Sequence, residues 1–363
     1  MKFLLILAVP LLGLCYVAWH VWTILPFSAV WKSLVVGLGI CSFLLLFMNF
    51  GQGFDRMPLP LARALYEVGT SSLFVFLYLI LIFLVLDIGR LAHAVPRAWL
   101  YENGVAATTI AVLLFGVFLY GNIHYKNKVR VALDIPTEKS LARPYKVIMV
   151  SDLHLGYHNP RGELARWIDL FNAERPDLVL IAGDIIDISV RPLLEEGMAQ
   201  EFRRLQAPVY ACLGNHEYYS QTPRAQAFCR DAGIRVLRDE SASIDNHFAV
   251  IGRDDRTNLR RKSVQELAKG IAADTTFTIL LDHQPYNLED AERAGIDFQL
   301  SGHTHRGQVW PISWLTDAMY ECSWGSHQRG RTRYYVSSGI GIWGGKFRIG
   351  TQSEYVVATI HRE

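Results

Sequence analysis

The first third of the chain contains long apolar runs separated by short polar segments. Four stretches contain no Asp, Glu, Lys or Arg and come close to the roughly 20 residues that a helix needs to cross a bilayer. They extend approximately over residues 3–25, 33–50, 70–86 and 104–121. A cleaved signal peptide would explain the first stretch, which follows Lys2, but not the three after it. The pattern therefore predicts a bundle of four transmembrane helices over residues 1–125.

From Tyr145 onward the pattern changes to short apolar runs separated by polar, helix-like segments. This alternation is typical of successive β and α units and predicts an α/β domain over residues 145–363. Residues 126–144 are then expected to form a linker.

Basic residues beside the apolar stretches predict the orientation of the chain, because Lys and Arg are retained on the cytoplasmic side. If the chain crosses the membrane four times, three basic residues lie on one side of it, namely Lys32, Arg90 and Arg97. Eight lie on the other side, namely Lys2, Arg56, Arg63, Lys126, Lys128, Arg130, Lys139 and Arg143. We therefore expect a multi-pass protein of the inner (cytoplasmic) membrane, with both termini and the C-terminal domain in the cytoplasm and membrane lipids as partners.

Composition excludes some classes of protein. The formal net charge of +2, from 36 basic and 34 acidic side chains, gives no sign of a nucleic-acid partner. The odd number of cysteines, without any C-x-x-C spacing, argues against a disulfide framework, and Cys15, Cys41 and Cys212 are expected to be small buried hydrophobes. Because the apolar stretches lack charges, a transporter is disfavoured, and His20 is expected to reach water near a span end.

Five apolar runs of the C-terminal part are each followed by residues of types that commonly bind metal ions. These residues are Asp152 and His154, Asp184, Asn215 and His216, His283, and His303 and His305. In an open α/β sheet, loops beyond the carboxyl ends of strands converge, so separate motifs can form one site. Asp152 and His154 would point to the same side of a continuing strand and could bind one ion, and His303 and His305 repeat that spacing.

The chemistry of these side chains suits divalent ions. Carboxylate, imidazole and amide groups, without a thiolate, favour manganese, with iron or zinc as alternatives, over a structural zinc site. Two such ions would bind a phosphoryl group and activate a water, and Asp184 could bridge them. Gly183, Gly214 and Gly302 each precede one of these residues, where the absence of a side chain permits close approach.

In order, the blocks read D-x-H, G-D, G-N-H-E, a single His and G-H-x-H, and this combination resembles the calcineurin-like metallophosphoesterase superfamily. The resemblance extends over residues 145–360 and implies a four-layer αββα sandwich. It also implies that Asp152, His154, Asp184 and His305 hold one ion, that Asp184, Asn215, His283 and His303 hold the other, and that His216 lies outside both sets as the general acid.

Other residues near the motifs leave alternatives open. Asp187, Glu217 and Asp254 could orient ligand imidazoles or simply form turns and caps. Arg306 could contact a substrate phosphate or remain a solvated loop residue. The glycine-rich segment 337–345 could place N–H groups near a phosphate or form a turn, and the aromatic and basic segment 310–335 could cover the substrate or contact headgroups.

The motif-bearing runs 151–156, 214–219 and 301–308 and the tail 336–348 also resemble a membrane-associated bacterial branch that includes enzymes related to UDP-2,3-diacylglucosamine hydrolase. We therefore expect a metallophosphoesterase that hydrolyses a phosphomonoester, phosphodiester or pyrophosphate bond on a lipid-linked substrate by attack of metal-activated hydroxide. The alternative is a module that binds or senses a phosphate ligand, with metal but without turnover.

Overall fold

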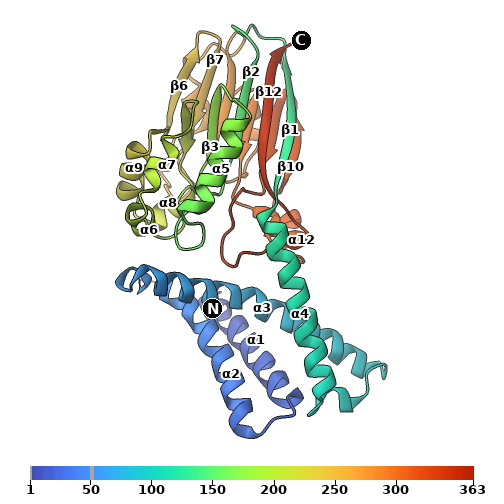
Figure 1. Ribbon diagram of the computed structural model, residues 1–363. Coiled ribbons are helices and arrows are strands. Elements are labelled where there is room, and N and C mark those ends of the chain that lie inside the picture. Colours follow the sequence, from blue (N-terminus) through green and yellow to red (C-terminus); the bar gives the residue numbers. More distant parts are fainter. Residues whose placement is uncertain (1, 50–52) are drawn as a thin grey trace. The chain divides into compact units, whose positions relative to one another are not determined.

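The computed structural model describes residues 2–49 and 53–363, and the chain divides into two compact units (Figure 1). The first unit comprises the residues up to Asn122 together with Gly344–Lys346. The second comprises Ile123–Trp343 and Phe347–Glu363. The change from long to short apolar runs along the sequence therefore accompanies a change of structural unit.

The first unit is helical, as its long apolar runs predict. It contains α1 (Lys2–Ile24), α2 (Ala29–Leu44), α3 (Leu59–Leu91), most of α4 (Gly104–Lys126), and the short 3₁₀ helices η1 (Leu45–Asn49), η2 (Gly53–Arg56) and η3 (Arg97–Leu100). Three segments are long and apolar enough to cross a membrane, namely Ala29–Met48, Leu59–Leu91 and Gly104–Lys126. Within the described residues the apolar stretch of α1, Pro10–Ile24, is shorter, so the fourth span stays a prediction. Phe50, the predicted end of the second span, lies outside the described residues.

Helix α3 is longer than the apolar stretch that predicts it. It has 33 residues, and at about 1.5 Å per residue such a helix exceeds the roughly 30 Å hydrocarbon core of a bilayer. The additional turns carry Arg63 and Glu67 near one end and Asp87 and Arg90 near the other. The charged residues of α3 thus lie in the turns beyond its apolar stretch.

Helices α1, α2 and α3 share a buried core. Leu14 and Val17 of α1 contact Phe43 of α2 and Phe76 and Phe83 of α3 in one cluster. Since lipid tails are as apolar as these side chains, helix association in a membrane relies on close packing and on interhelical hydrogen bonds rather than on the exclusion of water.

One interhelical polar contact corrects an expectation. His20 is 1% exposed, and its Nε2 lies 3.0 Å from Oδ2 of Asp87 on α3. The hydroxyl of Tyr16 donates to the same carboxylate oxygen at 2.8 Å, and the ring of His20 stacks on Phe83. The prediction that His20 reaches water at a span end is therefore wrong, because Asp87 supplies a partner inside the bundle.

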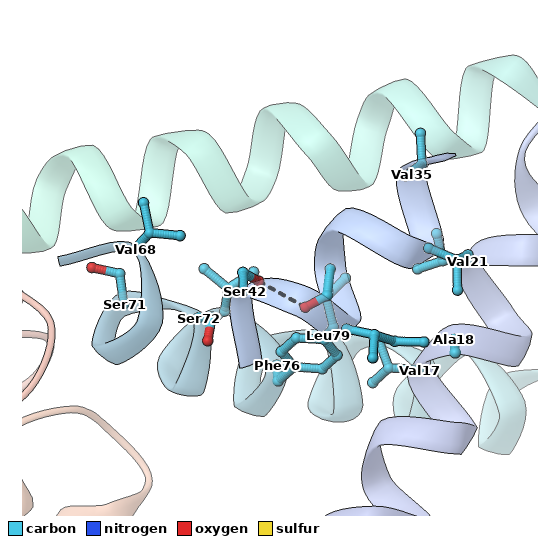
Figure 2. A pocket seen from close by; sticks show the side chains of 14 residues that line it. Val17, Ala18, Val21, Val35, Ser42, Val68, Ser71, Ser72, Phe76 and Leu79 are labelled. Carbon is cyan, nitrogen blue, oxygen red and sulfur yellow. Dashed lines mark hydrogen bonds between the residues drawn. The ribbon is translucent and has the colours of Figure 1, made fainter. Parts of the chain in front are cut away.

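An apolar cavity of about 390 Å³ lies among α1, α2 and α3 (Figure 2). Its walls include Val17, Ala18 and Val21 of α1, Ile40 of α2, and Val68, Ser72, Phe76 and Leu79 of α3. The hydroxyl of Ser42 donates to the Gly39 carbonyl and that of Ser72 to the Gly69 carbonyl, so both are satisfied within their own helices. None of the residues that line this cavity is charged.

The second unit contains two six-stranded mixed sheets (Figure 1). The first has the order β1-β12-β2-β3-β4-β5, with β1 (Lys128–Thr137), β2 (Tyr145–Val150), β3 (Leu178–Ala182), β4 (Val209–Cys212), β5 (Ile234–Val236) and β12 (Ser353–Arg362). The second has the order β10-β11-β9-β8-β7-β6, with β6 (Glu240–Asp245), β7 (Phe248–Gly252), β8 (Phe277–Leu281), β9 (Phe298–Ser301), β10 (Gly325–Arg329) and β11 (Thr332–Val336).

Short helices pack on the outer faces of these sheets. On the first sheet they are α5 (Arg161–Ala173), α6 (Arg191–Glu195), α7 (Met198–Phe202) and α9 (Thr222–Asp231), and on the second α10 (Val264–Ala268) and α11 (Glu289–Arg293). Helix α8 (Asn215–Tyr219) follows β4, and the 3₁₀ helix η4 (His305–Gly307) and α12 (Ile312–Met319) follow β9. Along β2, Ile148 and Val150 pack in the cluster that includes α5, α7 and α9, whereas Val147 and Met149 pack in the cluster shared by both sheets. Both faces of β2 are thus buried, which explains its continuous apolar run.

Strand directions bring the ends of several strands to one edge of the first sheet. Strands β2, β3 and β4 are parallel, so their carboxyl ends lie together. Strand β12 is antiparallel to β2 and parallel to β1, so β1 starts at this same edge. In register, Lys128 pairs with Ser353 and Val356 pairs with Met149, which places Lys128 about level with Asp152.

Two further expectations differ from the structure. Most of the segment 126–144, expected as a linker, is occupied by α4 and by β1, a ten-residue strand paired with β12 along its length. All five cysteines are free, but Cys15 and Cys41 are exposed, so the expectation that they are buried is wrong. Both lie in helices of the first unit, where an apolar side chain can face lipid.

Candidate metal centre

The loops that follow five strands bring the metal-binding motifs together. Asp152 and His154 follow β2, Asp184 follows β3, Asn215 and His216 follow β4, His283 follows β8, and His303 and His305 follow β9. Apart from the half-buried His303, all these side chains are buried. Strands of both sheets therefore contribute to one site.

The backbone of these loops is left-handed at several motif residues. Asp152 has a φ of 54°, His154 of 44°, Asp184 of 52°, His303 of 71° and His305 of 47°. Asp152 and His154, like His303 and His305, were expected to point to the same side of a continuing strand. Strand β2 ends at Val150 and β9 at Ser301, so these residues lie beyond the strands and this expectation is wrong. Non-glycine residues adopt this conformation at a cost of about 1–3 kcal/mol each, and such strain concentrates at functional sites.

The first group of side chains consists of Asp152, His154 and His305. One ligand atom from each lies within 4.8 Å of the others. Nε2 of His305 is 3.3 Å from Oδ1 of Asp152, Nε2 of His154 is 3.8 Å from the same oxygen, and the two Nε2 atoms are 3.0 Å apart.

The second group consists of Asp184, His283 and His303. Nδ1 of His283 lies 2.7 Å from the Ala182 carbonyl, which directs Nε2 to within 3.1 Å of Oδ2 of Asp184. The same oxygen lies 3.7 Å from Nε2 of His154, so Asp184 lies between the two groups. His303 and His305 belong to different groups, which differs from the shared ion that their spacing suggested but matches the two sets that the resemblance implies.

The donor atoms fit two divalent ions. Oδ1 of Asn215 is buried and makes no hydrogen bond with any described residue, as is also true of Nε2 of His283. A buried polar atom without a partner is costly, and coordination of a cation would satisfy both atoms. Together with the two His/Asp groups, they form a binuclear site of carboxylate, imidazole and amide ligands, without a thiolate.

Electrostatics keep the central carboxylate ionised. Burial raises the pKa of Asp184, but the adjacent His283 and His216 outweigh burial and lower this pKa well below its ordinary value. An ionised carboxylate is the form that can bridge two cations.

Two glycines permit the close contacts that this packing requires. A Cβ at Gly214 would collide with Oδ1 of Asp184, and a Cβ at Gly302 would collide with Oδ2 of Asp152. Both positions match the expectation that glycine precedes a ligand in order to allow close approach.

His216 lies beside both groups. The residue is 6% exposed, its backbone N–H donates to Oδ1 of Asp184 at 2.9 Å, and its ring centroid is 4.5 Å from that of His154. Nδ1 lies 3.1 Å from the Asp187 carbonyl and 3.2 Å from the Asp187 carboxylate. A ring nitrogen of His216 also falls within 4.8 Å of ligand atoms of His154 and Asp184, so distance alone does not separate it from the ligands.

The three carboxylates singled out from the sequence have different surroundings. Asp187 contacts imidazoles as expected, since its Oδ1 lies 3.4 Å from Nδ1 of His154 and 3.2 Å from Nδ1 of His216. Glu217 instead accepts the backbone N–H groups of Asp184, Gly214 and Ile186. Burial and the nearby Asp184 raise the pKa of Glu217 to about 7.

Asp254 also departs from the orienting role considered for it. Its carboxylate accepts from the Tyr218 hydroxyl, Nε of Arg238 and the Asn258 amide. Asp254 and Glu217 thus hold loops next to the site rather than ligand imidazoles.

The glycine-rich segment 337–345, for which a phosphate contact and a turn were both considered, supports the site through its backbone. The N–H groups of Ile340 and Gly341 donate to the carbonyls of Ser151 and Asp152, so they hold the first metal-binding loop rather than facing a phosphate. Arg306 has a φ of 48°, and its guanidinium lies 4.1 Å from the centroid of the Trp324 ring.

The sequence reading missed one residue that holds a ligand. Arg348 is fully buried and donates to the carbonyls of His305 and Gly341, both at 2.9 Å. It is the last residue of the tail 336–348 but belongs to none of the metal-binding motifs, so nothing in the sequence indicated this contact. A buried arginine requires such partners, because an unpaired buried charge is strongly unfavourable.

Comparisons with known proteins agree with this geometry. The family model described as calcineurin-like phosphoesterase matches residues 145–307. A metallophosphoesterase of Aquifex aeolicus is 32% identical over 225 residues, which cover 59% of this chain and 84% of that protein. A metallophosphoesterase of Campylobacter jejuni is 29% identical over 259 residues, which cover 69% of each chain. A Danio rerio protein described as a transmembrane protein with a metallophosphoesterase domain is 29% identical over 307 residues, which cover 76% of this chain and 70% of that protein. These descriptions name a class of protein and no substrate.

Replacing the central carboxylate tests the binuclear site. In Asp184→Asn we expect fewer than two ions per chain after loading with Mn²⁺ and gel filtration, because the amide cannot bridge two cations as an anion does. The metal content is measured by inductively coupled plasma mass spectrometry. Asp169→Asn, at an exposed carboxylate paired with Arg204, serves as the control and should load as the unmodified protein does. Normal metal content together with normal activity in Asp184→Asn would refute the site.

Proposed function

The chain belongs to the calcineurin-like metallophosphoesterases, and from this premise we propose that it hydrolyses a phosphomonoester, phosphodiester or pyrophosphate bond of a lipid-linked substrate at the membrane surface. The observation that carries the proposal is the pair of buried His/Asp groups joined by Asp184, with His216 beside them. A buried site of this kind in a chain with membrane-crossing helices suits a phosphate at the bilayer surface.

We assign the metal ligands to two ions according to the two His/Asp groups. Asp152, His154, Asp184 and His305 would hold one ion, and Asp184, Asn215, His283 and His303 would hold the other. When bound, two divalent ions polarise phosphoryl oxygens and lower the pKa of a bound water. Manganese is our first expectation for both ions, with iron or zinc as alternatives.

His216 is proposed as the general acid. Among the described residues, Nδ1 of His216 faces two oxygens of Asp187, the backbone carbonyl and Oδ1. Both accept hydrogen bonds, so Nδ1 carries a hydrogen. Nε2 of His216 then remains to donate a proton to the leaving oxygen. Burial raises the pKa of Asp187, but hydrogen bonds with His154 and His216 lower it below its ordinary value, so this carboxylate is an anion near neutral pH.

The membrane attachment is proposed to consist of four spans, with α1 as the first. Relatives from Danio rerio and Bos taurus are described as transmembrane proteins. We propose an inner (cytoplasmic) membrane location with both termini in the cytoplasm, because more of the basic residues beside the spans lie on that side.

Two features of the second unit support a substrate at the membrane surface. Strand β1 begins directly after α4, about level with Asp152, so the chain enters this sheet at the edge that bears the site. Helix α12 begins soon after His305 and exposes Trp314, Leu315 and Met319, with exposed fractions of 66%, 59% and 58%. Exposed Trp, Leu and Met on a short helix suit contact with the headgroup and acyl boundary of a bilayer.

The general-acid role predicts a specific defect. His216→Ala should lower kcat by roughly 10²–10⁴-fold while metal content is retained, because proton transfer is lost and the ligands remain. Hydrolysis of p-nitrophenyl phosphate or its diester and the metal content are measured on the same preparation. His247→Ala, in the turn between β6 and β7, is the control. Loss of metal in His216→Ala would instead assign this ring as a ligand.

The lipid-linked substrate is tested by a phosphate-release screen over lipid phosphates, UDP-linked lipids and nucleotides, with each candidate metal. We expect higher kcat/KM for a lipid-linked phosphate in vesicles than for soluble phosphates. Trp314→Ala should lower only the vesicle activity, because the residue does not belong to the metal centre. Equal use of a soluble substrate in detergent and in bilayers would contradict the proposal, and phosphate binding without turnover would favour the sensing alternative.

The topology predicts where reporters become active. Fusions of a cytoplasm-active reporter after Asp55 and after Glu363 should both be active, and a fusion after Val95 should be inactive. An exported alkaline phosphatase fused at the same positions should give the opposite pattern. Active exported phosphatase at Glu363 would place the second unit outside the cytoplasm.

A further inference from the structure

A chain of buried hydrogen bonds joins the last turn of α4 to the first metal-binding loop within the second unit. The hydroxyl of Tyr125 donates to Oδ1 of Asn159 at 2.6 Å. Nδ2 of Asn159 donates to the carbonyls of Leu153 and His154, at 2.9 and 3.0 Å. Tyr125 is 2% exposed and Asn159 is fully buried, so water does not compete for these bonds.

The bonds of Asn159 require an amide side chain. Its oxygen accepts from a phenol and its nitrogen supplies two donors to two carbonyls, which uses the groups that an amide presents. A carboxylate in the same place would face the carbonyls of Leu153 and His154 with an acceptor. The Asn159 carbonyl also accepts the N–H of Gly156 at 3.2 Å, which closes the loop on itself.

This loop contains a ligand in an unfavourable conformation. His154 has a φ of 44°, which a histidine adopts only where other contacts stabilise it. The amide of Asn159 holds the carbonyl of His154, and the N–H of His154 donates to the Asp184 carbonyl at 3.0 Å. The carbonyl of His154 is therefore held by a side chain, and its N–H by the backbone of the loop that follows β3.

The other end of the chain of bonds is also held in place. Nζ of Lys128 lies 3.5 Å from the centroid of the Tyr125 ring and donates to the Tyr125 carbonyl at 2.7 Å. The same amine lies 3.9 Å from Oε1 of Glu163 on α5, and its side chain is 4% exposed. Tyr125 is thus fixed within the second unit, where α4 passes into β1.

We propose that Asn159 is a positioning residue for the metal ligand His154, and that Tyr125 orients Asn159, so that the last turn of a membrane-crossing helix supports the metal centre. The inference depends on the assignment of His154 as a ligand. Residues that support a ligand from outside the coordination shell typically change metal affinity by 10–100-fold when replaced. A purely structural asparagine would change the stability of the fold without this effect.

Metal titration of the full-length protein in nanodiscs tests the proposal. The protein is stripped with a chelator and dialysed against graded free Mn²⁺, and the bound metal is counted. In Asn159→Ala we expect one of the two ions to bind about 10–100-fold more weakly, with saturating Mn²⁺ restoring occupancy. Tyr125→Phe, which removes a single oxygen, should give a smaller shift in the same ion.

The control is Tyr334→Phe, because Tyr334 is also 2% exposed and its hydroxyl donates to the Leu288 carbonyl at 2.7 Å, away from the metal-binding loops. This variant should bind both ions as the unmodified protein does. The proposal is overturned if Asn159→Ala binds both ions with unchanged affinity while its melting temperature falls. If Asn159→Ala does not fold, Tyr125→Phe decides, and a titration identical to that of Tyr334→Phe refutes the role of Tyr125. Metal binding is read without substrate, so failure of the proposed hydrolysis remains a separate result.

Discussion

The carboxylate of Asp184 lies between two groups of imidazoles and acids, and the rest of the catalytic unit depends on keeping it there. A buried ionised carboxylate is unfavourable unless positive charge and hydrogen bonds surround it. His283, His154 and the backbone N–H of His216 all approach this carboxylate, each from a loop after a different strand. The two sheets must therefore place these strand ends within a few ångströms of one another, and the binuclear chemistry follows from that convergence.

Bringing these loops together forces several residues into unfavourable backbone conformations, which hydrogen bonds from other residues stabilise. Several motif residues adopt left-handed backbone, and Gly214 and Gly302 are packed so closely against carboxylates that no Cβ would fit. Arg348 holds the carbonyl of His305, Glu217 holds the N–H groups of the loops after β3 and β4, and Asn159 holds the carbonyl of His154. The ligands are thus positioned by a second set of buried polar residues, whose own hydrogen bonds are satisfied in the process.

The helical unit obeys a different constraint. Helices that lie in a membrane cannot use the exclusion of water to associate, and this unit offers packed aromatic side chains and polar contacts such as that of Asp87 with Tyr16 and His20. The connection to the catalytic unit is short, since β1 begins two residues after α4 ends. Strand β1 thus enters the sheet at the edge that bears the metal-binding loops.

Local sequence determined the long helices, the start of the α/β unit and the identity of the metal-binding motifs, because apolar run length and residues at strand ends are properties of short segments. The D-x-H and G-H-x-H blocks were recognisable for this reason. Tertiary structure alone decided that β1 occupies the expected linker and that Asp87 buries His20. Only tertiary contacts bring Arg348 to the carbonyl of His305 and Asn159 to that of His154. Each of these depends on contacts between residues far apart in the chain, and such contacts leave no periodic pattern in the sequence around either partner.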